Sequence, residues 1–230
     1  MSSDTECCVR GTILHIMDHM EDKTPFAQLE AAVKKCEDES NVEVVVVLSK
    51  RSGPYRDVHF LCGAISALIT ALTLVFSSVQ FSDLYLAPNL IVMFFLGYCI
   101  PWLFPSLYTW LTSRERRAKQ VQAAAELAFF RQGVSLTRSR TGLLVFLSLQ
   151  EADGALLGDV GVRKAIPGDV MGELTVKLRQ SAAAKDPVEA TLNYLAELCE
   201  PLSKFVPFKE NNPNELPNRP VWLEGNETWP

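Results

Sequence analysis

Four carboxylates are the residues of this sequence best suited to bind a metal ion. They are Glu43, Glu151, Asp153 and Asp159. Glu151 and Asp153 belong to the turn motif EADG, and we expect Asp159 to lie at the same end of the hairpin that this turn closes. Converging carboxylate oxygens could there bind a divalent cation: Mg²⁺, Ca²⁺ or Mn²⁺. Because the fixed ligand spacing of an EF-hand is absent, a second interpretation stays open: Glu151 and Asp153 are solvated turn residues and Asp159 is a local cap.

A second group of possible ligands lies near the N-terminus. His15 and His19 are four residues apart, so on a helix they would share a face and could chelate a transition metal with Cys7 or Cys8. The stretch reads HIMDH and lacks the HExxH arrangement of zinc peptidases, and the vicinal cysteines could instead be acylated near a membrane. The remaining histidine, His59, begins an apolar run, so a Ser-His or Cys-His dyad would have to draw on the N-terminal segment.

Two apolar runs, 58–79 and 90–111, separate these candidates along the chain. Neither contains Asp, Glu, Lys or Arg, and each is long enough at about 1.5 Å per residue to cross a hydrocarbon core of about 30 Å. The connecting loop, 80–89, carries a single charged residue, Asp83. Basic residues lie on both outer sides of the pair: Lys50, Arg51, Arg56, Arg114, Arg116, Arg117 and Lys119. The positive-inside rule therefore predicts a two-pass integral membrane protein with both termini on the cytoplasmic side of the lipid bilayer.

Small side chains follow one face of the first apolar run. Gly63, Ala67 and Thr70 recur at helical spacing, and Gly97 is the matching small residue of the second run. Such positions allow two membrane helices to approach closely. A channel or carrier would require charge or a repeat within the spans, and the sequence has neither, so the runs are expected to anchor the protein.

The apolar patterns outside these runs predict an α/β fold. The β-branched run 42–48 is typical of a strand buried on both faces, and 143–149 and 155–162 are the next predicted strands. Helix starts are predicted at Thr24-Pro25, Arg114, Pro167 and Asp186-Pro187. One strand with one helix cannot bury its faces, so we expect both flanks of the membrane hairpin to form one mixed sheet sandwiched by helices.

The predicted organisation has five parts. They are a weakly structured N-terminal segment (1–23), the first part of the α/β domain (24–57), a transmembrane helical hairpin (58–111), the second part of the domain (112–206) and an extended or disordered tail (207–230). The net charge of -5 argues against a nucleic-acid partner, because phosphate binding requires concentrated Lys and Arg. Six scattered cysteines, including Cys36 and Cys199 on apolar helix faces, suggest small hydrophobic residues in a reducing compartment and no disulfide framework.

Several short segments resemble the TPM-domain family, and in particular its membrane-embedded branch, in which a helical hairpin follows the first strand. They are EVVVV (43–47), SGPY (52–55), TR (137–138), RTGLLVFLSLQE (140–151), DVGV (159–162) and NELPN (214–218). The resemblance implies an α/β sandwich with a mixed sheet. It also implies activities found among relatives, since some members are acid phosphatases and others bind divalent metal through acidic loop residues. Arg140 stands where soluble relatives often carry Asp, and Ala152 where membrane relatives often carry Arg.

Together these patterns favour a non-enzymatic, membrane-anchored module that binds a partner such as a membrane protein complex. The alternative is a metal-dependent phosphatase at the membrane surface that uses Glu151, Asp159 and Glu43.

Overall fold

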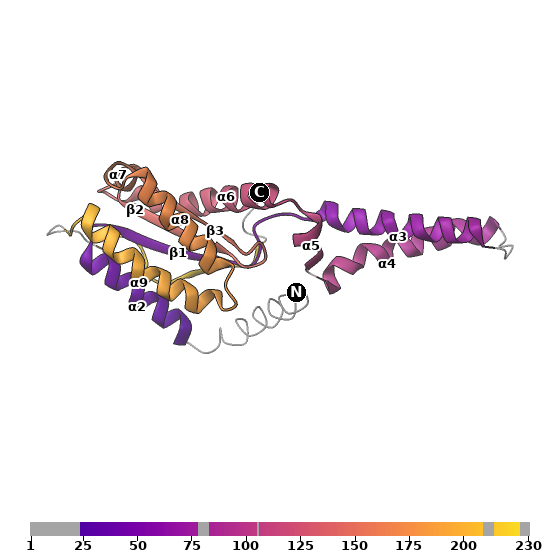
Figure 1. Cartoon of the computed structure of the whole chain (residues 1–230), viewed down its shortest axis with the longest axis horizontal. Helices are drawn as coiled ribbons and strands as arrows, with labels where there is room; N and C mark the ends of the chain where they lie inside the picture. The colour runs from indigo at the N-terminus through magenta and orange to yellow at the C-terminus, as the bar shows by residue number, and fades with distance from the viewer. Residues whose placement is uncertain (1–23, 78–82, 105, 209–213, 226–230) are drawn as a thin grey trace. The chain divides into compact units, whose positions relative to one another are not determined.

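The computed structural model describes residues 24–77, 83–104, 106–208 and 214–225 (Figure 1). Two compact units make up the chain. One combines residues up to 53 with residues from 117 onward, and the other spans residues 54–116. We call the first the α/β unit and the second the hairpin unit. The α/β unit is thus assembled from two stretches of sequence that the hairpin unit separates.

A four-stranded mixed sheet forms the centre of the α/β unit (Figure 1). Its strands are β1 (Glu43–Ser49), β2 (Gly142–Ser148), β3 (Asp153–Gly158) and β4 (Val221–Leu223), in the order β3-β2-β1-β4. β1 is parallel to β2 and β4, and β3 is antiparallel to β2. Every residue of β1 and β2 is buried, as the continuous apolar runs predict for central strands. The predicted α/β class with a mixed sheet is therefore confirmed.

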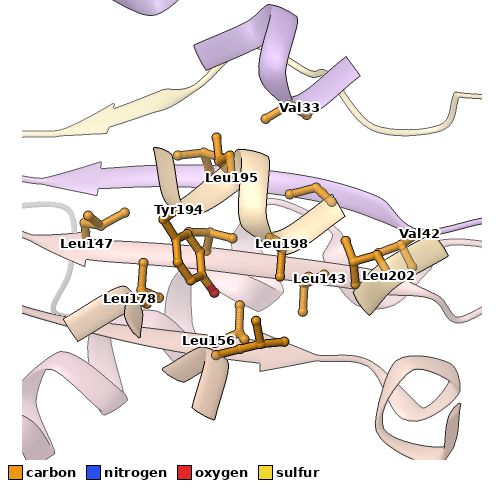
Figure 2. Close-up of a cluster of buried hydrophobic side chains, with 14 of the residues drawn as sticks. Val33, Val42, Leu143, Leu147, Leu156, Leu178, Tyr194, Leu195, Leu198 and Leu202 are labelled. Carbon is orange, nitrogen blue, oxygen red and sulfur yellow. The ribbon is translucent and has the colours of Figure 1, made fainter. Parts of the chain in front are cut away.

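Helices cover both faces of this sheet. Side chains alternate along β1, so that Val44 and Val46 face one layer and Val45 and Val47 face the other. The first layer consists of α2 (Thr24–Glu39), α8 (Gly168–Ala182) and α9 (Pro187–Phe205), and the second of α6 (Arg114–Arg131). Figure 2 shows the first layer, in which Leu195 and Leu198 of α9 lie over the sheet and belong to the same apolar cluster as Val33 of α2 and Leu178 of α8.

Two sequence predictions for this unit need correction, and one short element was not predicted. The predicted strand 155–162 ends at Gly158, because Asp159 caps a short helix, α7 (Val160–Ala165). The predicted tail 207–230 contains β4, which pairs with β1 as an edge strand. A 3-10 turn, η1 (Val134–Leu136), follows α6. These features depend on long-range pairing or on a single cap, which apolar periodicity does not report.

The cysteine prediction was also wrong for one pair. Cys36 of α2 and Cys199 of α9 form a disulfide, with their Cα atoms 4.7 Å apart. The sequence does place both residues on apolar helix faces. It could not indicate that these two faces pack against each other, because they are 163 residues apart. Cys62 and Cys99, both in the hairpin unit, are free thiols.

The hairpin unit contains three helices: α3 (Arg56–Phe76), α4 (Asp83–Leu103) and α5 (Ser106–Leu111). The second apolar run, 90–111, is therefore split between α4 and α5, and α4 begins seven residues before it. Gly63 and Gly97 lie where α3 meets α4. An added Cβ at Gly63 would come within 2.9 Å of Phe94, and one at Gly97 within 2.5 Å of Ser66. Glycine at these two positions allows the close approach of the helices.

Candidate functional site

The register of the sheet separates the four candidate carboxylates into two pairs. Glu43 is opposite Gly142 at one end of the sheet, and Asp159 follows β3 at that same end. Asp153 is opposite Ser148 at the other end, where Glu151 also lies in the turn between β2 and β3. The expectation that Asp159 shares the turn with Glu151 and Asp153 was wrong, because an antiparallel strand carries its two ends to opposite edges. Among the described residues, no three His, Cys, Asp or Glu side chains are grouped as metal ligands.

Asp159 is a helix cap. Its Oδ1 accepts a hydrogen bond of 2.7 Å from the backbone N–H of Val160, the first residue of α7. Its Oδ2 lies 3.1 Å from Nε of Arg140, whose backbone is in the left-handed region with φ 56°. The carboxylate is almost fully buried, and these two groups already occupy it. The local-cap interpretation of Asp159 therefore agrees with the structure.

Glu151 is not a solvated turn residue. It is 4% exposed, and both of its carboxylate oxygens accept from the backbone N–H of Ser52, at 3.0 and 3.1 Å. Ser148 Oγ donates to the same carboxylate, and Ser52 Oγ donates to Ser148 Oγ at 2.6 Å. These bonds fix the chain just after β1, immediately before it leaves for the hairpin unit. Asp153, in contrast, is partly exposed and lies 3.3 Å from Nε of Arg179.

Two carboxylates, those of Glu37 and Glu43, lie at the other end of the sheet, and sequence reasoning identified only Glu43 as a candidate. Glu37, near the end of α2, accepts from the backbone N–H of Val44 at 2.9 Å and from Nδ2 of Asn218 at 2.5 Å. Glu43 Oε2 accepts from the backbone N–H groups of Glu215 and Leu216, both at 3.3 Å. The two glutamates therefore bind the segment that leads into β4. The sequence signal for Glu37 was weak, because it belongs to the acidic run that ends α2.

The environment of this pair raises both pKa values. Burial is the main cause for each, because desolvation disfavours the charged carboxylate. The pKa of Glu37 rises to about 7, with the bond from Val44 opposing the rise and the charges of Glu43 and Asp38 adding to it. The pKa of Glu43 also rises, against the bonds from Leu216 and Glu215. Both glutamates are therefore easier to protonate than ordinary carboxyl groups.

His59 of α3 is a buried polar side chain of the hairpin unit. Its Nδ1 lies 2.8 Å from the carbonyl oxygen of Tyr98 in α4, and its Nε2 lies 2.8 Å from the hydroxyl of Tyr108 in α5. A carbonyl oxygen only accepts, so Nδ1 donates to Tyr98, and the second ring nitrogen shares a hydrogen bond with the Tyr108 hydroxyl. One histidine thus joins three helices. Its sequence signal was that it is the sole histidine within an apolar run.

The rest of the hairpin unit is apolar on its outside. α3 and α4 each contain a stretch that is long and apolar enough to cross a membrane, Arg56–Phe76 and Leu86–Leu103. Only 17% and 11% of these stretches are buried. Their outward side chains include Leu68, Ile69, Val75, Phe76, Ile91, Phe95 and Leu96. A core helix of a soluble protein would be mostly buried, so the hairpin unit does not have the burial expected of one.

The N-terminal candidates Cys7, Cys8, His15 and His19 lie outside the described residues. Ala67 and Thr70, the other small residues predicted to pack between the membrane helices, are partly buried in α3. Thr70 donates to the carbonyl of Ser66 in its own helix at 2.9 Å. The packing contact between α3 and α4 is therefore best defined at Gly63 and Gly97.

The geometry defines the chain as an α/β protein with an inserted apolar helical hairpin. Comparison with protein-family models and with curated proteins finds no match. Among solved structures, the chain is similar to the NMR structure of the BA42 protein from the psychrophilic bacterium Bizionia argentinensis. The TM-score is 0.53 over 87% of this chain and 93% of that one, with 12% sequence identity. At this identity the likeness concerns the fold.

Proposed function

We propose that this protein is an integral membrane protein that crosses the bilayer twice through α3 and α4. The observation that carries the proposal is the exposure of apolar side chains on these helices: only 17% and 11% of the two stretches are buried. Covering the outward side chains with lipid removes them from water and leaves the polar contacts of His59 inside the helix bundle. Gly63 and Gly97 supply the close helix contact that membrane helices use for association.

Both ends of the hairpin unit lie on the same side of the membrane in this proposal, and that side is the cytoplasm. An ion pair supports the shared side: Arg116, which follows the hairpin, donates from Nη2 to Oδ1 of Asp57, which begins it, at 3.0 Å. The basic residues that flank the hairpin support the cytoplasmic assignment through the positive-inside rule.

The α/β unit is, in this proposal, a TPM-like module that binds a partner, such as a membrane protein complex, without catalysing a reaction. Its acidic side chains already have internal roles, since Asp159 caps α7 and Glu151 fixes Ser52. A candidate contact surface is offered by Phe130 and Leu136, which are large apolar side chains and are 70% and 78% exposed. Contiguous patches of exposed apolar side chains can mark protein–protein contacts.

Two experiments test these statements. Alkaline carbonate washing should leave the full chain in the vesicle pellet, and protease added to the cytoplasmic face should cleave on both sides of the hairpin. Release into the supernatant, or protection of one side alone, would contradict the membrane proposal. For the partner, the tagged chain extracted in mild detergent should co-purify with other proteins, and the double variant Phe130→Ser/Leu136→Ser should lose them. Val176→Ser, at an exposed site on α8, is the matched control.

A metal-dependent phosphatase is the second candidate, and one observation favours it. The buried carboxylates of Glu37 and Glu43 have raised pKa values, as acidic groups at catalytic sites often do, and Asp159 lies at the same end of the sheet. This function requires that Mg²⁺, Mn²⁺ or Ca²⁺ bind at micromolar level and that Asp159→Asn abolish binding. Absence of calorimetric binding, together with no hydrolysis of a generic phosphoester, would exclude it.

A further inference from the structure

The disulfide between Cys36 and Cys199 fastens together the two sequence parts of the α/β unit. Cys36 belongs to the part before the hairpin unit and Cys199 to the part after it, so the bond closes a loop that includes both membrane helices. The two residues are 0% and 4% exposed, in the contact between α2 and α9. No solvent-borne thiol can reach the sulfur atoms at this burial unless one of the two helices moves.

α2 has few other attachments of comparable strength. Leu29 and Val33 pack into the apolar cluster that also contains α9, and Glu37 accepts its two hydrogen bonds from Val44 and Asn218. These are non-covalent contacts along one helix face, and each of them can break and re-form without chemistry. The disulfide is the single covalent link between α2 and α9, so its loss changes how often α2 separates from the unit.

We propose that Cys36–Cys199 is a site of reversible oxidation that controls the docking of α2. The inference rests on the proposed cytoplasmic position of the α/β unit, because disulfides in a reducing compartment are usually transient and redox-sensing. The reductant is a low-molecular-weight thiol of the glutathione class. Two such thiols supply two electrons and two protons: the Sγ–Sγ bond breaks, both cysteines become thiols, and the two reductant molecules join in a disulfide of their own.

The structure couples this reaction to helix motion. A thiolate must approach a sulfur in line with the bond, and both sulfurs are enclosed by α2 and α9. Reduction therefore proceeds through an opened form of the helix pair, and re-oxidation requires that the pair close again. The oxidised protein holds α2 docked, whereas the reduced protein samples the open form more often.

The first experiment measures the state of the bond. Membranes containing the full chain are equilibrated with glutathione buffers of increasing oxidised fraction, quenched with acid and alkylated with a mass-tagged maleimide. The wild type should lose two tags as the buffer becomes oxidising, with its midpoint inside the tested range, and Cys36→Ser/Cys199→Ser should lose none. A bond that stays oxidised throughout, or never forms, would overturn the proposal. Cys62→Ser/Cys99→Ser, which removes the free thiols of the hairpin unit, should titrate like the wild type.

The second experiment measures α2 itself and needs no variant. Hydrogen exchange of the purified full chain is compared before and after reduction with excess glutathione. Amides of α2 should exchange about tenfold faster after reduction, whereas those of β2 and β3 should change less than twofold. Equal exchange of α2 in both states would overturn the proposal. Because this comparison is made on purified protein, it stands even if carbonate washing disproves membrane insertion, so the two failures are distinguishable.

Discussion

The two units of this protein contain the same kinds of apolar side chain in opposite situations. In the α/β unit, leucines such as Leu143 and Leu198 are 0% exposed and pack against other side chains. In the hairpin unit, Leu68 and Phe76 point outward and have no covering partner among the described residues. Folding alone removes the first group from water and leaves the second group exposed; in the proposed membrane topology, lipid covers the second group. The comparison teaches that burial within the chain, more than composition, separates a folded core from a membrane span.

The two units also differ in how their buried polar groups are hydrogen-bonded. The α/β unit buries several carboxylates and satisfies them with backbone N–H groups, as Glu151 does with Ser52 and Glu43 does with Leu216. In the described part of the hairpin unit, both ring nitrogens of buried His59 are hydrogen-bonded, whereas Oγ1 of buried Thr112, just after α5, has no hydrogen-bond partner. The contacts of His59 agree with a hydrocarbon environment, in which a buried polar group requires a partner inside the protein.

Identical substitutions in the two units should give the largest contrast. Leu198→Ala removes a fully buried side chain from the core and should lower the free energy of unfolding of the α/β unit by about 2–5 kcal/mol. Leu72→Ala, on the outward side of α3, should change stability by about 0.5 kcal/mol, because lipid or detergent refills the space. Urea unfolding of the detergent-solubilised chain measures both. Equal losses for the two variants would contradict the division between core and lipid-facing surface.

A charge placed at matched exposed sites sharpens the same contrast. Ile69 and Val176 are 59% and 54% exposed, the first in α3 and the second in α8. Ile69→Asp should disfavour membrane insertion by about 2.5–3.5 kcal/mol, because an ionised carboxylate enters the hydrocarbon. Val176→Asp should change the stability of the α/β unit by no more than about 0.5 kcal/mol. The fraction of each variant that resists carbonate washing is the measurement, and full retention of Ile69→Asp would count against insertion.

The features that sequence analysis predicted are local ones. The continuous apolar runs predicted β1 and β2, the basic and alanine-rich pattern predicted α6 from Arg114 to Arg131, and Asp186 caps α9 by accepting from Val188 and Glu189. Each of these signals lies within one element. The two apolar runs of the hairpin unit are of the same kind, although α4 ends at Leu103 and α5 begins at Ser106, both within the second run.

The missed features depend on contacts between residues far apart in the sequence. Glu151 meets Ser52 across 99 residues, and Glu43 meets the backbone of Leu216 across 173. The disulfide joins helices whose packing no periodicity specifies. The expected position of Asp159 was wrong for a simpler reason: β3 is antiparallel to β2, so Asp159, which follows β3, lies at the opposite end of the sheet from Asp153. A sequence indicates which side chains are polar, whereas the register decides which of them meet.

The next contrast is the pH dependence of the stability of the α/β unit. The pKa of Glu37 is about 7 in the folded chain and about 4.5 in the unfolded chain, so between these values the folded state binds the proton more tightly. The α/β unit should therefore lose about 1–2 kcal/mol of stability as pH rises from about 4.5 to 7 and remain level above that, with partial solvent access reducing the full effect. Glu37→Gln should flatten this part of the profile, as measured by urea midpoints at pH 5.5 and 8. A wild-type profile that rises with pH over this interval would disprove the assignment.

The smallest contrast compares two buried tyrosine hydroxyls. The hydroxyl of Tyr108 in the hairpin unit shares a hydrogen bond of 2.8 Å with Nε2 of His59, whereas the hydroxyl of Tyr194 has no hydrogen-bond partner among the described residues. Tyr108→Phe should cost about 1 kcal/mol, because it leaves a ring nitrogen of His59 without its hydrogen-bond partner in an apolar setting. Tyr194→Phe should be neutral or stabilising by up to about 1 kcal/mol, because it removes a buried polar group that gains nothing from folding. Thermal unfolding in mild detergent measures both, with the unit that unfolds identified by hydrogen exchange. A larger loss of stability for Tyr194→Phe than for Tyr108→Phe would contradict this prediction. It would mean that the Tyr194 hydroxyl is satisfied within the α/β unit and that the His59 contacts do not hold α3, α4 and α5 together.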